Sequence, residues 1–151
     1  GYVEEVDPAR VIDDCGVLVG HLLAKTRIEL DRRLEATRCP VINRQELQQV
    51  LVNLLVNAVQ AMEAQGGGTL SLATRDAEGD MVEIAIADTG PGLPAELLAQ
   101  LFQPFVTRKR EGTGLGLWIS RGIVERYGGD ITAANRPEGG ACFTLRLKAE
   151  R

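Results

Sequence analysis

Residues 45–62 read QELQQVLVNLLVNAVQAM, and the rest of the chain is interpreted around this stretch. Most of its apolar residues recur at the i, i+3, i+4, i+7 spacing of an amphipathic helix. They are Leu47, Val50, Leu51, Leu54, Leu55, Ala58, Val59 and Met62. Val52 and Val56 lie off this stripe and are also apolar. The sequence therefore predicts a helix that is buried over most of its circumference.

The same helix carries a polar stripe, formed by Gln49, Asn53, Asn57 and Gln60. Asn53 and Asn57 are one turn apart, so their side chains share a face of the helix. A buried amide without a hydrogen-bond partner costs about 1–3 kcal/mol. We therefore expect these side chains to meet a wet cavity, a ligand or a cation. The alternative is amide–backbone hydrogen bonding inside a core.

The composition is that of an ordinary soluble protein, with 44% hydrophobic and 25% charged residues. At 151 residues the chain suits one domain, residues 1–151. The net charge of −4 gives no bias towards nucleic acid or an anionic membrane. No apolar run reaches the ~18 residues of a membrane span, and no signal peptide is recognisable. Cys15, Cys39 and Cys142 lie far apart, which is typical of a reduced, cytosolic protein without a structural zinc site.

Periodicity and turn signals predict an α+β fold. After a polar entry segment, a helix is expected up to residue 25, with Asp7 as its N-cap and with the only histidine, His21, on its surface. A half-buried strand over 27–35 and a short strand over 40–43 precede the central helix, which should end at the glycines 66–68. Strands 69–74 and 81–87 form a hairpin, a short helix covers 94–101, and a longer helix ends at residue 127. Strands 131–134 and 141–147 close the chain.

Residues 88–93 read DTGPGL and follow directly after the strand predicted over 81–87. An acid at the end of a strand, followed by two glycines that frame a proline, suggests a rigid turn that shapes the wall of a pocket. A simple turn with a solvent-facing Asp88 is the alternative.

Residues 112–118, GTGLGLW, begin the last predicted helix. Backbone N–H groups at a helix start, left accessible by glycine, form a ready site for phosphate. The pattern is not a Walker P-loop, because no Lys-Ser/Thr follows, and it fails the Rossmann spacing. Phe102 and Phe105 precede a basic loop, TRKRE at 107–111, and are predicted to anchor a movable flap or to serve as core residues.

Together these motifs resemble the catalytic, ATP-binding domain of bacterial sensor histidine kinases, a branch of the fold family shared with DNA gyrase B, Hsp90 and MutL. The resemblance covers nearly all of residues 3–148. It includes the N box at 49–62, a first glycine box at 88–93, the F box at 101–105, a second glycine box at 112–117 and the late strand around 143–145. It implies the two-layer α/β sandwich of the Bergerat fold, with a mixed, mostly antiparallel sheet covered on one face by helices.

The resemblance also implies roles for matching residues. Asn57 would ligate a Mg²⁺ that bridges the phosphates of ATP, Asp88 would accept a hydrogen bond from the adenine amino group, and Thr144 would support the base. The remaining nucleotide contacts would come from Gly90, Gly92, Phe102, Phe105, Arg108, Lys109, Gly112, Thr113, Gly114, Leu115, Gly116 and Leu117. Arg110 would offer a further cation to the terminal phosphates.

Two positions depart from related proteins in informative ways. Gln60 replaces a basic residue that many such kinases carry, so phosphate neutralisation would rest more on the basic loop and on Lys109. Members of the fold family that hydrolyse ATP place a glutamate where this chain has Asn53. An amide cannot take a proton from water at neutral pH, so the domain would hold ATP for transfer. Asn53 and Lys109 are therefore the predicted catalytic residues.

The predicted function is transfer of the γ-phosphoryl group of Mg·ATP to a histidine on an upstream dimerisation hairpin that the sequence lacks. A response regulator would act downstream, and the domain itself is expected to be a cytoplasmic monomer without nucleic-acid or membrane contacts. A membrane anchor elsewhere in the full-length protein is compatible with this. The alternatives are an anti-sigma-type serine kinase and a nucleotide-gated binding module without chemistry of its own.

Overall fold

The computed structural model describes residues 2–106 and 116–149. In chain order, the elements of the described residues are β1 (Glu4–Glu5), α1 (Pro8–Leu23), β2 (Ile28–Leu34), β3 (Val41–Ile42), α2 (Arg44–Glu63), β4 (Gly68–Ala77), β5 (Met81–Ala87), α3 (Ala95–Gln100), α4 (Gly116–Arg126), β6 (Asp130–Asn135) and β7 (Ala141–Lys148). Every predicted helix and strand is therefore found, with small shifts at most ends, while the predicted start of the last helix at 112 lies outside the described residues.

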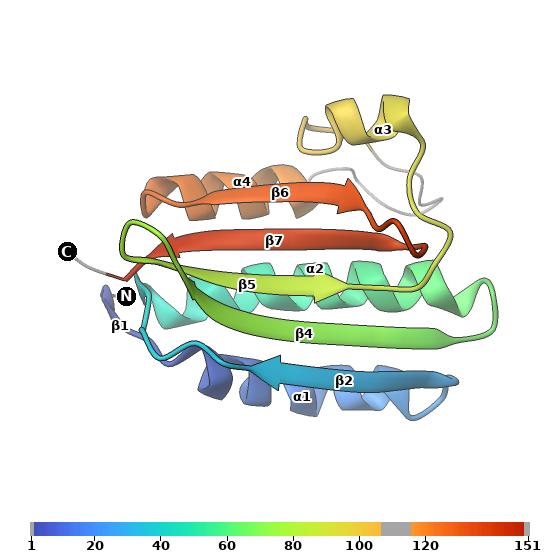
Figure 1. Ribbon diagram of the computed structural model, residues 1–151, viewed down its shortest axis with the longest axis horizontal. Coiled ribbons are helices and arrows are strands. Elements are labelled where there is room, and N and C mark those ends of the chain that lie inside the picture. The colour runs from blue at the N-terminus through green and yellow to red at the C-terminus, as the bar shows by residue number, and fades with distance from the viewer. Residues whose placement is uncertain (1, 107–115, 150–151) are drawn as a thin grey trace.

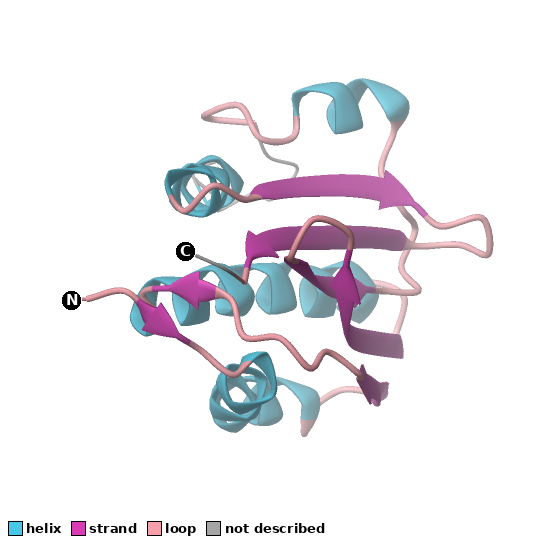
Figure 2. Ribbon diagram, turned by 60° about the vertical axis from the view of Figure 1, so that its left-hand side comes forward, coloured by secondary structure: helices cyan, strands magenta, loops and turns pink. Residues whose placement is uncertain are grey.

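Five strands form the main sheet in the order β2-β4-β5-β7-β6. Only the β2–β4 pair is parallel, and the other three pairs are antiparallel. Helices α1, α2 and α4 cover one face of this sheet (Figure 1). The short β1–β3 pair lies near the N-terminus, apart from the main sheet (Figure 2). This arrangement confirms the predicted α+β class and the two-layer sandwich.

Helix α2 supplies the centre of the core. All eight residues of its predicted apolar stripe are buried. They pack with residues of the sheet that alternate along β5 and β7, among them Ile84, Ile86, Leu145 and Leu147. Val52 and Val56 are only partly buried, so the helix is less enclosed than its composition suggests. Its less buried side is the one that carries Asn53 and Asn57, which leaves this side for the site described below.

Truncation of a leucine in the centre of α2 should show how much this stripe contributes. Leu54 is fully buried, so Leu54→Ala is expected to lower the free energy of unfolding by about 2–5 kcal/mol through lost burial and a residual cavity. Leu18→Ala on α1, where the leucine is 54% exposed, is the matched control and should cost less than about 1 kcal/mol. Urea unfolding of both variants measures the difference. An equal loss of unfolding free energy in Leu54→Ala and Leu18→Ala would contradict the central position of α2 in the core.

Two features near the N-terminus differ from the prediction. The entry segment contains β1 and the buried Val6, whose N–H donates to the Pro40 carbonyl. Strand β2 is mostly exposed, with Leu30 at 47%, because it is an edge strand that α1 only partly covers. The alternation in its sequence predicted the strand correctly but overestimated its burial.

Capping interactions set the ends of the helices. Asp7 accepts a hydrogen bond from the Ala9 N–H at the start of α1, as predicted for an N-cap. After α2, the Gly67 N–H donates to the Met62 carbonyl and the Gly66 N–H to the Glu63 carbonyl. Gly66 has a φ of +88°, which a glycine adopts without strain. The chain can therefore reverse sharply from α2 into β4.

Candidate nucleotide-binding site

The polar side of α2 faces the start of α4. The Asn53 Nδ2 donates a hydrogen bond of 3.2 Å to the hydroxyl of Ser120, a buried residue one turn into α4. A Cβ atom on Gly116, the first residue of α4, would lie 2.7 Å from the Asn53 Oδ1. Only a glycine therefore fits at position 116 without displacing Asn53. The two helices bring the predicted catalytic amide and the end of the second glycine box into contact.

Asn57 and Ala61 continue the same side of α2, one and two turns after Asn53. Asn57 is partly buried. At Ala61, the loop that follows β5 approaches the helix, and a Cβ atom on Gly90 would lie 3.1 Å from the Ala61 carbonyl oxygen. Asn57 is thus positioned along α2 between the start of α4 and the loop of the first glycine box. The three motifs are consecutive along one side of a single helix.

Asp88 is 3% exposed and lies at the end of β5. Its Oδ1 accepts hydrogen bonds from the main-chain N–H groups of Gly90, at 2.9 Å, and Ala141, at 3.2 Å. A carboxylate that accepts two N–H groups has a fixed orientation. The alternative of a solvent-facing aspartate in a simple turn is therefore wrong. Among the described residues both hydrogen bonds to this carboxylate are made at Oδ1, which leaves Oδ2 for a ligand.

The loop after Asp88 is held against the end of α2. The Gln65 Nε2 donates to the Thr89 carbonyl at 2.9 Å, and the Thr89 hydroxyl accepts from the Thr69 N–H at 2.9 Å. Gly92 has a φ of +75°, a conformation that glycine adopts at little cost. The loop is therefore fixed to both the end of α2 and the start of β4 by hydrogen bonds. Its role as the wall of a pocket stays a prediction.

The two phenylalanines of the F box have different environments. Phe102 packs edge-on against Phe143 with ring centroids 6.3 Å apart, and the guanidinium carbon of Arg121 lies 5.6 Å from its ring centroid. Phe105 is 74% exposed and has a positive φ of 67°. Phe102 is thus joined to the core beside α4, whereas Phe105 is not packed against it.

Most of the predicted phosphate-contacting residues cannot be placed. Arg108, Lys109, Arg110, Gly112, Thr113, Gly114 and Leu115 lie outside the described residues. Gly116 begins α4, and Leu117 is partly buried against the core. The roles of the basic loop and of the first two glycines of the second glycine box therefore remain predictions.

Thr144 is not brought to Asp88. Side chains alternate between the two faces of a strand, and its neighbours Phe143 and Leu145 both point into the core beneath the helices. Thr144 therefore lies on the opposite face of the sheet, which corrects its predicted role beside the base. The contact that β7 does make with Asp88 is the main-chain N–H of Ala141. The alternation in ACFTLRL was the signal that could have excluded Thr144.

Among residues 2–106 and 116–149, no cluster of ionisable ligands surrounds the metal site predicted at Asn57. The described residues contain no group of three or more His, Cys, Asp or Glu side chains that could hold a metal ion. Mg²⁺ in nucleotide sites usually keeps several waters and takes few protein ligands in addition to phosphate oxygens. A single amide oxygen from Asn57 fits this kind of site.

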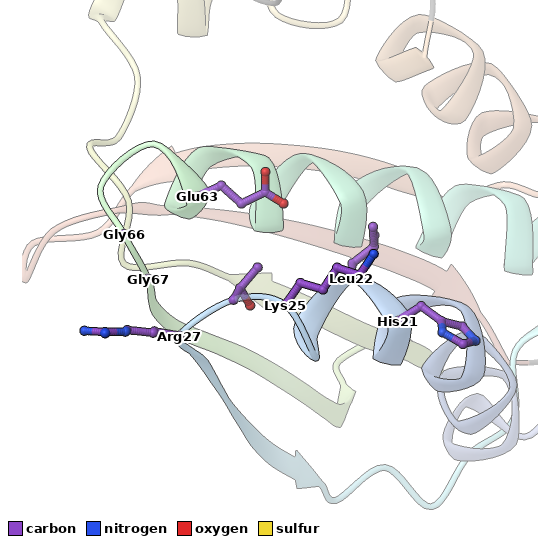
Figure 3. Close-up of a pocket in the computed structure, with 8 residues that line it drawn as sticks. His21, Leu22, Lys25, Arg27, Glu63, Gly66 and Gly67 are labelled. Carbon is purple, nitrogen blue, oxygen red and sulfur yellow. The ribbon is translucent and has the colours of Figure 1, made fainter.

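A cavity of about 740 Å³ lies elsewhere, between the C-terminal ends of α1 and α2 (Figure 3). It is lined by His21, Leu22, Lys25, Thr26, Arg27, Glu63, Gly66 and Gly67, none of which belongs to the predicted site. Lys25 and Arg27 follow the C-terminal end of α1, where the helix dipole favours cationic side chains. His21 is exposed, as predicted for a helix-surface histidine.

Cys15 is likewise separate from the site and fully buried in α1. Burial, together with the nearby Asp14 carboxylate, raises the pKa of its thiol to about 11. This thiol stays protonated at neutral pH and therefore packs as an apolar side chain.

Asn53 and Asn57 on α2, the buried Asp88 at the exit of β5 and the glycine at the start of α4 are the features that the sequence resemblance assigns to a nucleotide-binding domain. Comparison with known proteins identifies the family. The family model described as "Histidine kinase-, DNA gyrase B-, and HSP90-like ATPase" matches residues 42–151, so the chain belongs to this family. Binding of ATP follows from this membership.

Individual relatives are sensor kinases. The chain is 37% identical to the sensor histidine kinase ZraS of Klebsiella oxytoca over 145 residues. This alignment covers 95% of the chain and 31% of ZraS. The nucleotide-free catalytic domain of the histidine kinase ThkA superimposes with a TM-score of 0.86 and 31% identity, over 99% of this chain and 97% of that one. ThkA in complex with the response regulator protein TrrA matches with a TM-score of 0.81 and 28% identity. This match covers 98% of the present chain and 42% of the ThkA chain.

These comparisons show an ATP-binding kinase domain of the two-component sensor type. The chain spans about a third of the length of the ZraS relative. Within residues 2–106 and 116–149, no helix is both long and apolar enough to cross a membrane.

Proposed function

We propose that this chain holds Mg·ATP and donates its γ-phosphoryl group to a histidine of an upstream helical hairpin. In this step the γ-phosphorus forms a bond to an imidazole nitrogen, its bond to the β–γ bridging oxygen breaks, and ADP leaves with the electron pair. The alignment of Asn53, Asn57 and the Asp88 loop along one side of α2 is the observation that carries the proposal.

Each element of the site has a distinct task in this proposal. Asp88 accepts the hydrogen bond from the adenine amino group, while Gly90 and Gly92 keep the adjacent wall free of side chains. The start of α4 at Gly116 directs N–H groups and the positive end of the helix dipole at the phosphates. When bound, Mg²⁺ neutralises phosphate charge during transfer, and Asn57 would hold it. Lys109, outside the described residues, is the proposed cation for the terminal phosphate.

Asn53 supports transfer to a protein acceptor over hydrolysis. Its amide is already committed to the Ser120 hydroxyl and has no basic atom with which to activate water. Reaction would therefore wait until the histidine of the hairpin enters the site. The serine-kinase and binding-module alternatives are not favoured, because the relatives described above are histidine kinases.

The proposed partners follow from the same relatives. The upstream hairpin would supply the phosphoacceptor and the dimer contact, and a response regulator would receive the phosphoryl group. The ThkA–TrrA complex supports this second partner. We propose a cytoplasmic location for the domain and a monomeric state for the isolated chain.

Titration with ATP and GTP, each with and without Mg²⁺, tests the nucleotide site directly. We expect ATP to bind, Mg²⁺ to strengthen binding, and GTP to bind more weakly because guanine presents a carbonyl where adenine has its amino group. Steady-state hydrolysis by the isolated chain should stay below about 1 s⁻¹, the lower end of ordinary enzymes. Equal affinity for GTP, or faster hydrolysis, would contradict the proposal.

A further inference from the structure

The end of β6 holds the loop of the first glycine box through an asparagine that the sequence motifs do not include. The Asn135 Oδ1 accepts a hydrogen bond of 2.8 Å from the Leu93 N–H, and its Nδ2 donates one of 2.7 Å to the Leu93 carbonyl. Both polar groups of one amide are thus paired with both main-chain groups of one residue. The side chain pairs with the loop as the main chain of a neighbouring strand would.

The adjacent residue holds the other end of the same loop. The Arg136 guanidinium donates a hydrogen bond of 2.9 Å to the Asp88 carbonyl oxygen. Gly140, across the turn between β6 and β7, packs so closely on Asp88 that an added Cβ would lie 1.9 Å from the same oxygen. Residues 135 and 136 therefore fix the two ends of the loop, Leu93 and Asp88, to one strand end.

The contact also includes Gly92, the residue before Leu93. A Cβ atom on Gly92 would lie 2.9 Å from the Asn135 Oδ1, so the glycine backbone rests directly on this amide. Asn135 is itself exposed. Hydrogen bonds of an exposed side chain contribute little to global stability. The consequence of this contact is therefore local, namely the position of the loop.

We propose that Asn135 is a positioning residue for the adenine base. By fixing Leu93 and Gly92, Asn135 determines the position of the 88–93 loop relative to the Asp88 carboxylate oxygen that would bind the base. This inference rests on the proposed function, because it needs the 88–93 loop to contact a nucleotide. Asn135 itself touches no nucleotide and acts only through the loop.

The test compares binding of ATP, ADP and AMP to the wild type, Asn135→Ala and Asn135→Asp by calorimetry. Alanine removes both hydrogen bonds, and we expect affinity for all three nucleotides to fall by the same factor, about five- to tenfold. Aspartate keeps the acceptor for the Leu93 N–H but sets a carboxylate oxygen against the Leu93 carbonyl, so its loss should be at least as large. The matched control is Thr132→Ala, an exposed change on the same strand, which should leave affinity unchanged.

Two further readouts separate positioning from a purely structural role. The preference for ATP over GTP should shrink in Asn135→Ala, and the hydrogen exchange of the Leu93 amide should accelerate, while the melting temperature stays within about 2 °C of the wild type. AMP is included because it lacks the β- and γ-phosphates.

The outcomes are distinguishable. A wild-type chain that binds no adenine nucleotide would overturn the proposed function and this inference with it. A wild type that binds ATP, with unchanged affinity in both Asn135 variants, would overturn the inference alone. A loss confined to ATP, with AMP binding intact, would also overturn it, because the effect would then lie at the phosphates.

Discussion

Alanine at position 57 is expected to abolish Mg²⁺-dependent phosphoryl transfer while the fold survives. The substitution removes the only proposed protein ligand of the metal, and loss of a group that merely supports a ligand already costs 10–100-fold, so we expect a loss of more than about 100-fold. Alanine is the best helix former, and Asn57 lies on the less buried side of α2, so the helix should tolerate the change. The Mg²⁺ enhancement of ATP binding should disappear in the same variant.

The measurement is transfer of labelled phosphate from ATP to the hairpin histidine, made on the protein that includes its upstream hairpin. Gln45→Ala is the matched control, because Gln45 is an exposed amide on the same helix and lies outside the polar stripe that carries Asn57. It should transfer normally. If Asn57→Ala also transfers at the wild-type rate, the metal ligand lies elsewhere.

Local patterns in the sequence predicted the elements because each depends on neighbouring residues. The stripe of α2 follows from helical periodicity, and all eight of its members are buried. Asp7 and the glycines after α2 mark helix ends through contacts within a few residues. The burial of β2 was overestimated because the position of a strand in the sheet depends on distant partners, which periodicity does not reveal.

The site was predictable only where its residues belong to recognisable motifs. The motifs predicted Asn53, Asn57 and Asp88 as site residues. The structure places Asn53 and Asn57 on one side of α2, and the loop after Asp88 approaches the same helix at Ala61. Thr144 was wrongly placed because the strand was identified without deciding which of its faces points to the helices.

Contacts made across long sequence separations were not foreseeable. Ser120 meets Asn53 across 67 positions, and Asn135 meets Leu93 across 42. Neither residue type is unusual at its position in the sequence, and only the packing of α4 and β6 gives it a role. The residues that orient a site are therefore harder to predict than those that touch its ligand.

Asp88→Asn is expected to weaken ATP binding by about 1–3 kcal/mol, or roughly 5–150-fold, the scale of a lost charge-assisted hydrogen bond. The geometry also predicts the direction of the change in specificity. The N–H groups of Gly90 and Ala141 both donate to the Asp88 Oδ1, so an asparagine must place its carbonyl oxygen there. Its NH₂ group then occupies the position of Oδ2.

An NH₂ group at this position opposes the amino group of adenine, because both are donors, whereas it pairs with the carbonyl of guanine. The affinity for ATP should therefore fall, and the ratio of ATP to GTP affinity should fall by a larger factor because GTP gains a hydrogen bond. The two hydrogen bonds that fix the loop should be kept. Calorimetry with both nucleotides measures this, and a thermal melt confirms the fold. Asp31→Asn, which removes the same charge from the exposed edge strand β2, is the matched control and should change neither affinity. An Asp88→Asn variant that binds ATP as the wild type does would remove Asp88 from the adenine site. An equal loss of affinity for ATP and GTP would show that the carboxylate acts through its charge and not through the geometry of its hydrogen bonds.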